Sequence, residues 1–128
     1  MHIFPDPEWF DGFSRTLEAH PDFKEYGRWF DGTLSFRCDS VAASLVFERG
    51  IISRTYAGMT GYDILINATR QQWEDYLNSD LTLVRVHRNA LMEIRGDSVR
   101  VMQNWKALFF ITQILKFEIR ASRETLQK

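Results

Sequence analysis

The sequence predicts a single α+β domain, in which helices cover one face of a five-stranded, mostly antiparallel sheet. Apolar residues alternate with polar ones along three successive segments between residues 33 and 57, as in strands. Two further strands are expected at residues 62–68 and 90–95, and a helix start follows each of them. The chain has 128 residues, so we expect one domain, 1–128, that buries its own core.

An N-terminal helix is expected from about residue 7 to residue 19. Asp6 can cap it, and Pro7 suits the first helical position because no N–H is needed there. The helix should end at His20, because the residue before a proline is pushed out of helical geometry. Residues 21–26 are expected to form one more turn. The helix docks by apolar residues at helical spacing: Trp9, Phe10, Phe13 and Leu17.

The body of the fold, residues 29–118, begins with three strands, expected at residues 33–38, 41–47 and 51–57. Short turns separate them, which is typical of an antiparallel meander. After the fourth strand, Thr69 can cap a helix and Gln72 can complete a capping box.

The second half of the chain is expected to end in helices. Residues 81–88 fit a helix or a strand, and we favour a helix because Asp80 can cap it. The last helix is expected from Ser98 to Phe117, with a polar tail at 120–128 that frays.

The last helix is apolar on two sides, which predicts that something besides its own sheet covers it. The second apolar row is expected to contact a homodimer partner, another protein or a ligand, and the sequence leaves these alternatives open. That row consists of Phe110, Ile114 and Phe117.

Composition excludes several classes of function. With 16 basic and 17 acidic residues the net charge is −1, which argues against nucleic-acid binding. No Lys/Arg cluster adjoins an amphipathic anchor along the sequence, so charge does not indicate a membrane-surface role. The run from Trp105 to Ile119 is too short and too interrupted to span a bilayer. One cysteine, Cys38, forms no internal disulfide, and no signal peptide is evident, so a cytoplasmic protein is expected.

The stretch from residue 61 to residue 96 resembles the sterol carrier protein 2 family. In that family a strand carrying Asp and Ile runs into a helix with a small polar first residue and an aromatic fifth residue. A strand of the form Leu-x-Ile-x-Gly-Asp and a long helix follow. The matching residues here are Asp63, Ile66, Thr69, Trp73, Leu91, Ile94, Gly96 and Asp97. The chain ends Leu126-Gln127-Lys128, without the peroxisomal tripeptide of eukaryotic members, so peroxisomal targeting is not expected.

The resemblance implies an apolar tunnel between sheet and helices that binds fatty acyl chains, acyl-CoA or sterols. It implies no cofactor, no metal and no catalytic residue. It also allows an accessory role beside a lipid- or quinone-handling enzyme. The alternative to a tunnel is that the inward side chains meet and fill the space, as in most protein interiors. We expect the following residues around the tunnel: Phe36, Leu45, Ile64, Ile66, Trp73, Met102, Trp105 and Phe109.

A third hypothesis is a small acid–base enzyme. Small α+β enzymes can work with one charged pair in a pocket, and the candidate groups here are Arg54, Tyr56, Asp63 and His87. The three histidines are scattered, and none has the spacing of a metal site.

Overall fold

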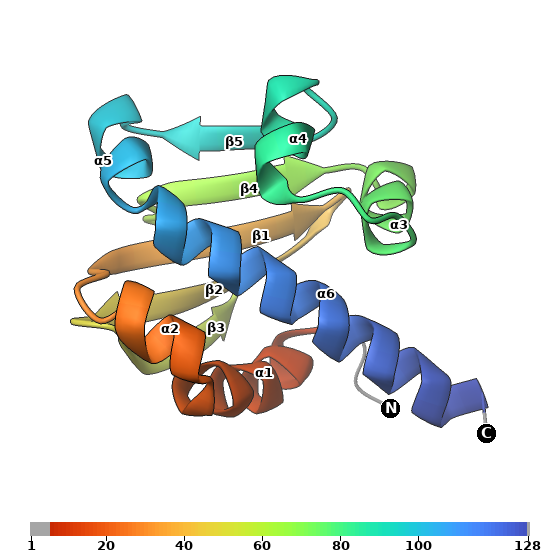
Figure 1. The fold of residues 1–128 in the computed structure, drawn as a ribbon, viewed down its shortest axis with the longest axis horizontal. Helices are drawn as coiled ribbons and strands as arrows, with labels where there is room; N and C mark the ends of the chain where they lie inside the picture. Colours follow the sequence, from red (N-terminus) through yellow and green to blue (C-terminus); the bar gives the residue numbers. More distant parts are fainter. Residues whose placement is uncertain (1–5, 128) are drawn as a thin grey trace.

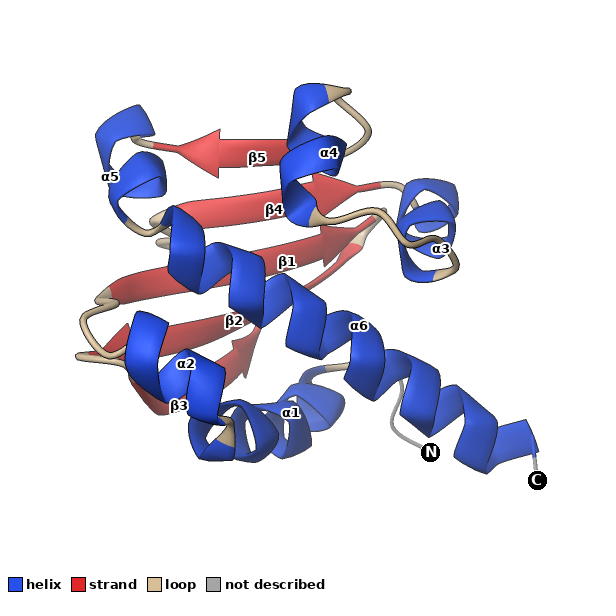
Figure 2. Cartoon of the chain, in the orientation of Figure 1, coloured by secondary structure: helices blue, strands red, loops and turns tan. Residues whose placement is uncertain are grey.

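The computed structural model describes the backbone of residues 6–127 and the side chains of Asp6 and residues 8–122. Figures 1 and 2 show the elements, and both hairpins of the meander occupy the expected segments. In chain order the elements are α1 (Pro7–Ala19), α2 (Pro21–Tyr26), β1 (Gly32–Cys38), β2 (Val41–Glu48), β3 (Ile51–Ala57), β4 (Ile64–Ala68), α3 (Arg70–Leu77), α4 (Leu83–Arg88), β5 (Glu93–Gly96), α5 (Ser98–Gln103) and α6 (Trp105–Gln127).

The strands form one five-stranded sheet in the order β3-β2-β1-β4-β5. Three neighbouring pairs are antiparallel, and β1 pairs with β4 in parallel, with Phe36 opposite Ile66. The predicted α+β fold with a mostly antiparallel sheet is confirmed.

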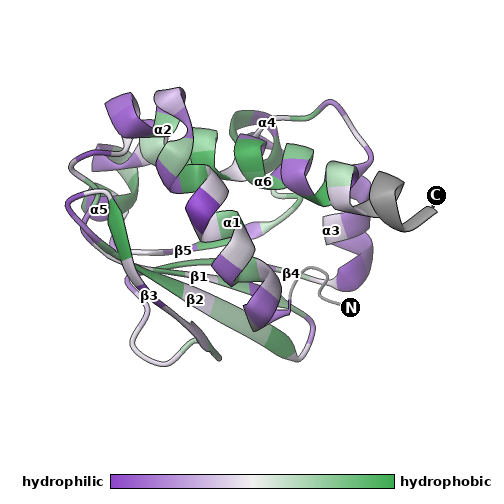
Figure 3. Cartoon of the chain, turned by 90° about the horizontal axis from the view of Figure 1, so that it is seen from below, coloured by the Kyte–Doolittle hydropathy of each residue, from purple (hydrophilic) through white to green (hydrophobic). Residues whose placement is uncertain are grey.

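The helices lie on one face of the sheet, as Figure 3 shows from below, and α6 crosses that face diagonally in Figure 1. Alternate residues of the three central strands point toward the helices, because successive side chains of a strand face opposite sides. These residues have 0–6% of their surface exposed and form the core with α1, α3 and α6: Leu34, Phe36, Cys38, Ala43, Leu45, Phe47, Ile64, Ile66 and Ala68.

The opposite face of the sheet is covered at its centre by the connection between β3 and β4. The strand order forces residues 58–63 to cross β2 and β1 on their way to β4. Ser44 donates a hydrogen bond to the carbonyl oxygen of Gly58 at 2.7 Å, and its hydroxyl lies 2.6 Å from that of Ser35. Both serines and Leu65 are fully buried, so this crossing shields a small polar pair.

Three helix starts are confirmed by their caps. The Asp6 carboxylate accepts from Glu8 N at 2.9 Å, and the Asp97 carboxylate accepts from Val99 N at 2.8 Å. Thr69 and Gln72 form both bonds of the capping box. These bonds satisfy N–H groups that a helix leaves unpaired at its beginning.

The expected strand at residues 90–95 is wrong in its start, since β5 begins at Glu93. Ala90 has a φ of 53°, and Leu91 N donates to Val86 O at 2.9 Å, so these residues close α4 instead. Gly96 then allows the switch to α5. Its φ is 151°, and a Cβ there would lie 2.7 Å from the carbonyl oxygen of Asp63.

The single helix expected at 98–117 is also wrong: Asn104 separates α5 from α6. The Asn104 side chain donates to Arg100 O at 2.8 Å, the kind of local bond by which asparagine competes with helical pairing. At the other end α6 continues to Gln127, past the expected fraying point. Arg120 holds it there by hydrogen bonds to Leu77 O and Ser79 O, both at 2.7 Å.

Candidate functional site

The tunnel was expected between the sheet and the helices, and aromatic rings from α1, β1 and α3 meet in part of that space. Phe36 stacks on Phe10 with ring centroids 5.3 Å apart, and its centroid lies 6.2 Å from that of Trp73. Trp73 also donates its indole N–H to Arg37 O at 2.7 Å, which ties α3 to the end of β1. At this point the inward side chains meet, as the alternative to an open tunnel requires.

The eight expected ligand contacts separate into two groups. Five lie inside the core, each with 0–1% of its surface exposed: Phe36, Leu45, Ile64, Ile66 and Trp73. The other three lie on α5 and α6. Met102 has 72% of its surface exposed, and Trp105 and Phe109 are half-buried. The structure therefore does not bring all eight around one space, and their contact with a ligand stays a prediction.

A small, partly open cavity of about 140 Å³ lies beside α3, between that helix, α4 and the segment before β5. Its wall is largely apolar. Tyr76 and Val86 are buried, while Leu91 is 41% exposed at its rim. The lining residues are Gln72, Asp75, Tyr76, Leu81, Val86, Ala90 and Leu91.

A polar groove of about 510 Å³ adjoins this cavity, because Gln72 and Ala90 line both. Its other walls come from the ends of β1 and β4, the start of α3 and the start of β5. Arg37 donates to Asp39 O at 2.7 Å, and Asn67 donates to the Glu93 carboxylate at 3.0 Å. Hydrogen-bond donors and acceptors, including one basic and two acidic side chains, therefore line the groove. The remaining lining residues are Ala68, Thr69 and Met92.

None of the residues predicted to bind a ligand lines the cavity or the groove. The capping box at the start of α3 was predicted from the sequence. The facing wall comes from the helix favoured for residues 81–88, which is confirmed as α4. Its expected cap is wrong, because the helix begins at Leu83 after Thr82, with no side-chain cap bond.

This arrangement of strands and helices occurs in known structures, although no family model and no curated protein matches the sequence. A crystal structure of sterol carrier protein 2 superposes with a TM-score of 0.75 and 16% identity, over 86% of this chain and 95% of that chain. The chain has the sterol carrier protein 2 fold. A conserved hypothetical protein from Thermus thermophilus matches with a TM-score of 0.68 and 19% identity, over 89% of this chain and 88% of that one. The UbiJ-SCP2 ubiquinone synthesis protein matches with a TM-score of 0.56 and 22% identity, over 84% and 92%.

In this version of the sterol carrier protein 2 fold, two cations of α6 hold one wall of the cavity. Lys116, only 3% exposed, donates to Ser79 O at 3.1 Å and to Leu81 O at 2.5 Å. Its Nζ lies 4.0 Å from the ring centroid of Tyr76. Burial, and then the neighbouring Arg120, lower the pKa of Lys116 to about 8. Burial raises the pKa of Tyr76 to about 12, so its hydroxyl stays a donor, to Thr112 O at 3.2 Å.

The acid–base hypothesis is contradicted by where its groups lie. Arg54 and Tyr56 are on β3, with the guanidinium 4.7 Å from the tyrosine ring centroid, on the face away from the helices. Asp63 precedes β4, three strand spacings or about 14 Å across the sheet. It binds Thr33 N at 2.7 Å and Arg100 at 3.1 Å. His87 lies on α4 in the helix layer, packed against Trp105.

The thiol of Cys38 and possible metal ligands were also considered as reactive groups. Cys38 is buried, and burial raises the pKa of its thiol, which opposes a nucleophilic role. Among the described side chains, those of Asp6 and residues 8–122, no group of three or more His, Cys, Asp or Glu could hold a metal ion.

Of the three residues on the last helix that were expected to contact a partner or ligand, Phe110, Ile114 and Phe117, one does not face outward. Ile114 is 5% exposed and packs into the core, because α6 turns it toward the sheet. Phe110 is half-buried beside Tyr26, and Phe117 has 62% of its surface exposed. Only the last two are available to a partner. No helix among residues 6–127 is both long and apolar enough to cross a membrane.

Proposed function

We propose that this chain binds a hydrophobic ligand with a polar end and carries it without changing it chemically. The proposal rests on an apolar cavity that lies next to a polar groove. Gln72 and Ala90 line both of them. An apolar tail in the cavity would lose its water contacts, and its polar end would find hydrogen-bond partners in the groove. The fold, which this chain shares with proteins named sterol carrier protein 2, supports the same interpretation.

The dimensions favour a slender acyl chain over a rigid sterol. Small-molecule pockets usually measure about 300–1,000 Å³, and the cavity of about 140 Å³ is smaller than that range. The end of a flexible chain can enter such a space, whereas a fused ring system needs the walls to move. The groove, at about 510 Å³, has room for the polar end. We therefore propose a fatty acid or acyl ester as the ligand class.

The expected residues Phe36, Leu45, Ile64, Ile66 and Trp73 lie in the packed core and do not line this cavity. A longer chain reaches them only if α4 moves outward. Such a movement is physically accessible, because α4 has six residues and no side-chain cap at its start. Met102, Trp105 and Phe109 have no part in this binding mode.

Native mass spectrometry of the freshly purified protein, followed by organic extraction, tests the proposal. We expect an added mass that corresponds to a lipid. A bare mass, together with no saturable binding of a fluorescent fatty acid, would overturn it.

A matched pair of variants tests the location. Leu91→Trp fills the rim of the cavity and should weaken fatty-acid binding by at least about tenfold. Ile51→Trp places the same side chain at an exposed position on β3, and should leave affinity within about twofold. Equal affinities for the two variants would place the ligand elsewhere.

The second candidate is an accessory subunit of an enzyme that handles a lipid, a quinone or another hydrophobic substrate. It is favoured by the exposed aromatic side chain of Phe117, and by the similarity to a protein named for ubiquinone synthesis. Here the bare chain would carry no lipid and would form a dimer or a complex of defined stoichiometry with its enzyme. Light scattering that shows a monomer, together with bound lipid, would exclude it.

A further inference from the structure

The charges of this chain are balanced in number but segregated along the chain. Between Leu81 and Phe117 there are six basic and two acidic residues, which leaves ten basic and fifteen acidic residues for the rest of the sequence. The formal charge of this segment is therefore +4, and that of the remainder is −5. The segment forms α4, β5, α5 and the first half of α6. Its charged residues are Arg85, Arg88, Arg95, Arg100, Lys106 and Lys116 against Glu93 and Asp97. Of these, Lys116 is buried, and Arg95 and Arg100 form ion pairs with Glu93 and Asp63.

Aromatic side chains gather on the side of α6 that faces away from the sheet, between α2 and α4. Tyr26 of α2 stacks on Phe110 at 4.9 Å, and Phe110 meets Phe109 edge to face at 5.4 Å. Trp105 packs against His87 of α4 at 5.3 Å. We call this surface the outer face. It consists of Tyr26, Trp105, Lys106, Phe109, Phe110 and Phe117, all exposed or half-buried.

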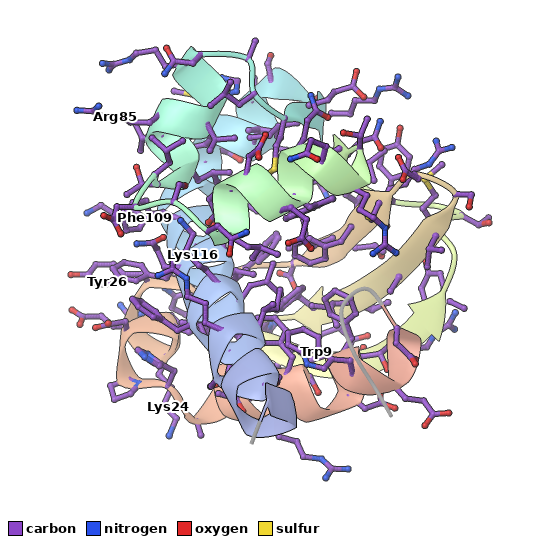
Figure 4. The ribbon with its side chains drawn as sticks, turned by 90° about the vertical axis from the view of Figure 1, so that its right-hand side faces the viewer. Trp9, Lys24, Tyr26, Arg85, Phe109 and Lys116 are labelled. Carbon is purple, nitrogen blue, oxygen red and sulfur yellow. The ribbon has the colours of Figure 1, made fainter. Side chains whose placement is uncertain are left out.

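Basic groups lie among these aromatic rings. The Lys106 ammonium is 5.2 Å from the ring centroid of Tyr26. Figure 4 shows Arg85 of α4, Phe109 of α6 and Tyr26 of α2 along one side of the molecule. Three helices therefore present apolar rings and cations together, although no stretch of sequence contains them side by side.

This combination matches the surface of an anionic membrane. Tyrosine and tryptophan settle at the level of lipid headgroups, where one part of the ring is apolar and the other is wet. Lysine and arginine can bury their stems against lipid while their charges stay at the headgroups. Each basic residue near an anionic leaflet contributes attraction that falls off over a Debye length. The two basic residues at this face, Arg85 and Lys106, favour a negatively charged partner.

We propose that the outer face docks on the surface of an anionic phospholipid bilayer. The docking is peripheral, and it orients α4 toward the lipid. It does not depend on the ligand proposed above, because the surface exists in the unliganded structure.

Vesicle flotation tests the proposal with the intact chain. Vesicles of phosphatidylcholine alone are compared with vesicles that contain about one-quarter phosphatidylglycerol. We expect binding to the anionic vesicles only, and its loss when salt rises from about 0.05 M to about 0.5 M. Equal binding to both vesicles, or binding to neither, would overturn the proposal.

Two charge reversals locate the contact. Lys106→Glu lies on the outer face and should weaken binding to anionic vesicles by at least about fivefold, the factor that corresponds to one basic residue. Arg54→Glu makes the same change in net charge on β3, on the opposite face of the sheet, and should leave binding within about twofold. Equal losses would show attraction to net charge alone and would overturn the assignment of this face.

Phe117→Ser tests the apolar part of the contact and should weaken binding without changing its salt dependence. Circular dichroism establishes that each variant is folded. The proposal is wrong if the wild type does not bind vesicles and light scattering shows a dimer that Lys106→Glu dissociates. The outer face would then bind a second copy of the protein.

Discussion

The Nζ atom of Lys116 lies 2.5 Å from the carbonyl oxygen of Leu81, a residue that lines the apolar cavity. Ser79 O, two residues earlier, accepts from both Lys116 and Arg120. These bonds place two positive charges at the carbonyl end of α3, where the helix dipole favours them. They hold the segment between α3 and α4 against α6, and therefore fix one wall of the proposed ligand site.

Burial of Lys116 predicts a rise in stability at alkaline pH. The pKa of this lysine is about 8 in the folded chain, against an ordinary value of 10.5. Between these values the unfolded chain binds more protons, so the free energy of unfolding should increase with pH. Below about pH 8 both states are protonated, and the cost of burying the charge is fully present.

Urea denaturation at about pH 7.5, 9 and 10 measures this effect, with Lys116→Met as the control that lacks the titrating group. Tyr76 acts in the opposite direction above pH 10, because its pKa is raised to about 12 in the folded chain. The measurements therefore stop at pH 10. Parallel curves for wild type and Lys116→Met would contradict the prediction.

The two sides of α6 should respond differently to the same substitution. Ile114→Asp buries an unpaired carboxylate in the core, and should lower the free energy of unfolding by about 3–5 kcal/mol or prevent folding. Phe117→Asp lies on the exposed side and should change it by about 1 kcal/mol or less. Thermal unfolding followed by circular dichroism measures both. Similar melting temperatures for the two variants would mean that α6 is rotated from the position described.

Gln113 offers a stabilising substitution. Its Oε1 atom is buried and has no hydrogen-bond partner among the described residues. A buried acceptor without a partner costs about 1–3 kcal/mol, so Gln113→Leu should increase the free energy of unfolding by about 1 kcal/mol. Chemical denaturation measures the change, and Gln113→Glu serves as the opposite control because it adds a charge. Destabilisation by Gln113→Leu would show that the amide is satisfied in solution.

Asp63 is expected to act in stability alone. Its carboxylate joins Thr33 N at the start of β1 to Arg100 of α5, so Asp63→Ala should cost about 1–3 kcal/mol of unfolding free energy. Arg100→Ala removes only a partly exposed ion pair and should cost about 1 kcal/mol or less. Fatty-acid binding should survive in both folded variants. A loss of binding in Arg100→Ala, with stability kept, would contradict this assignment.

The sequence was informative wherever the signal is local. The capping residues Asp6, Thr69 and Asp97 each bond a backbone N–H two or three residues away, and each begins a helix as predicted. The alternation in β1 and β2 identified their buried sides, including Phe36 and Leu45.

The candidate site was less predictable. Met102 shares a helical spacing with buried residues, yet it is exposed, because α5 ends at Gln103 and Asn104 breaks the helix. The cavity escaped prediction because its two walls, Tyr76 and Val86, come from different helices that only packing brings together.

The sequence by itself therefore determined the order of the strands, the starts of the helices capped by Asp6, Thr69 and Asp97, and the inward sides of the central strands, since periodicity and capping act within a few residues. Tertiary structure decided the parallel pairing of β1 with β4, the burial of Lys116 and the charged, aromatic outer face. Each of these joins residues far apart in the chain, such as Lys116 with Ser79 or Tyr26 with Phe110. Their proximity follows from how the sheet and α6 pack, which no local pattern encodes.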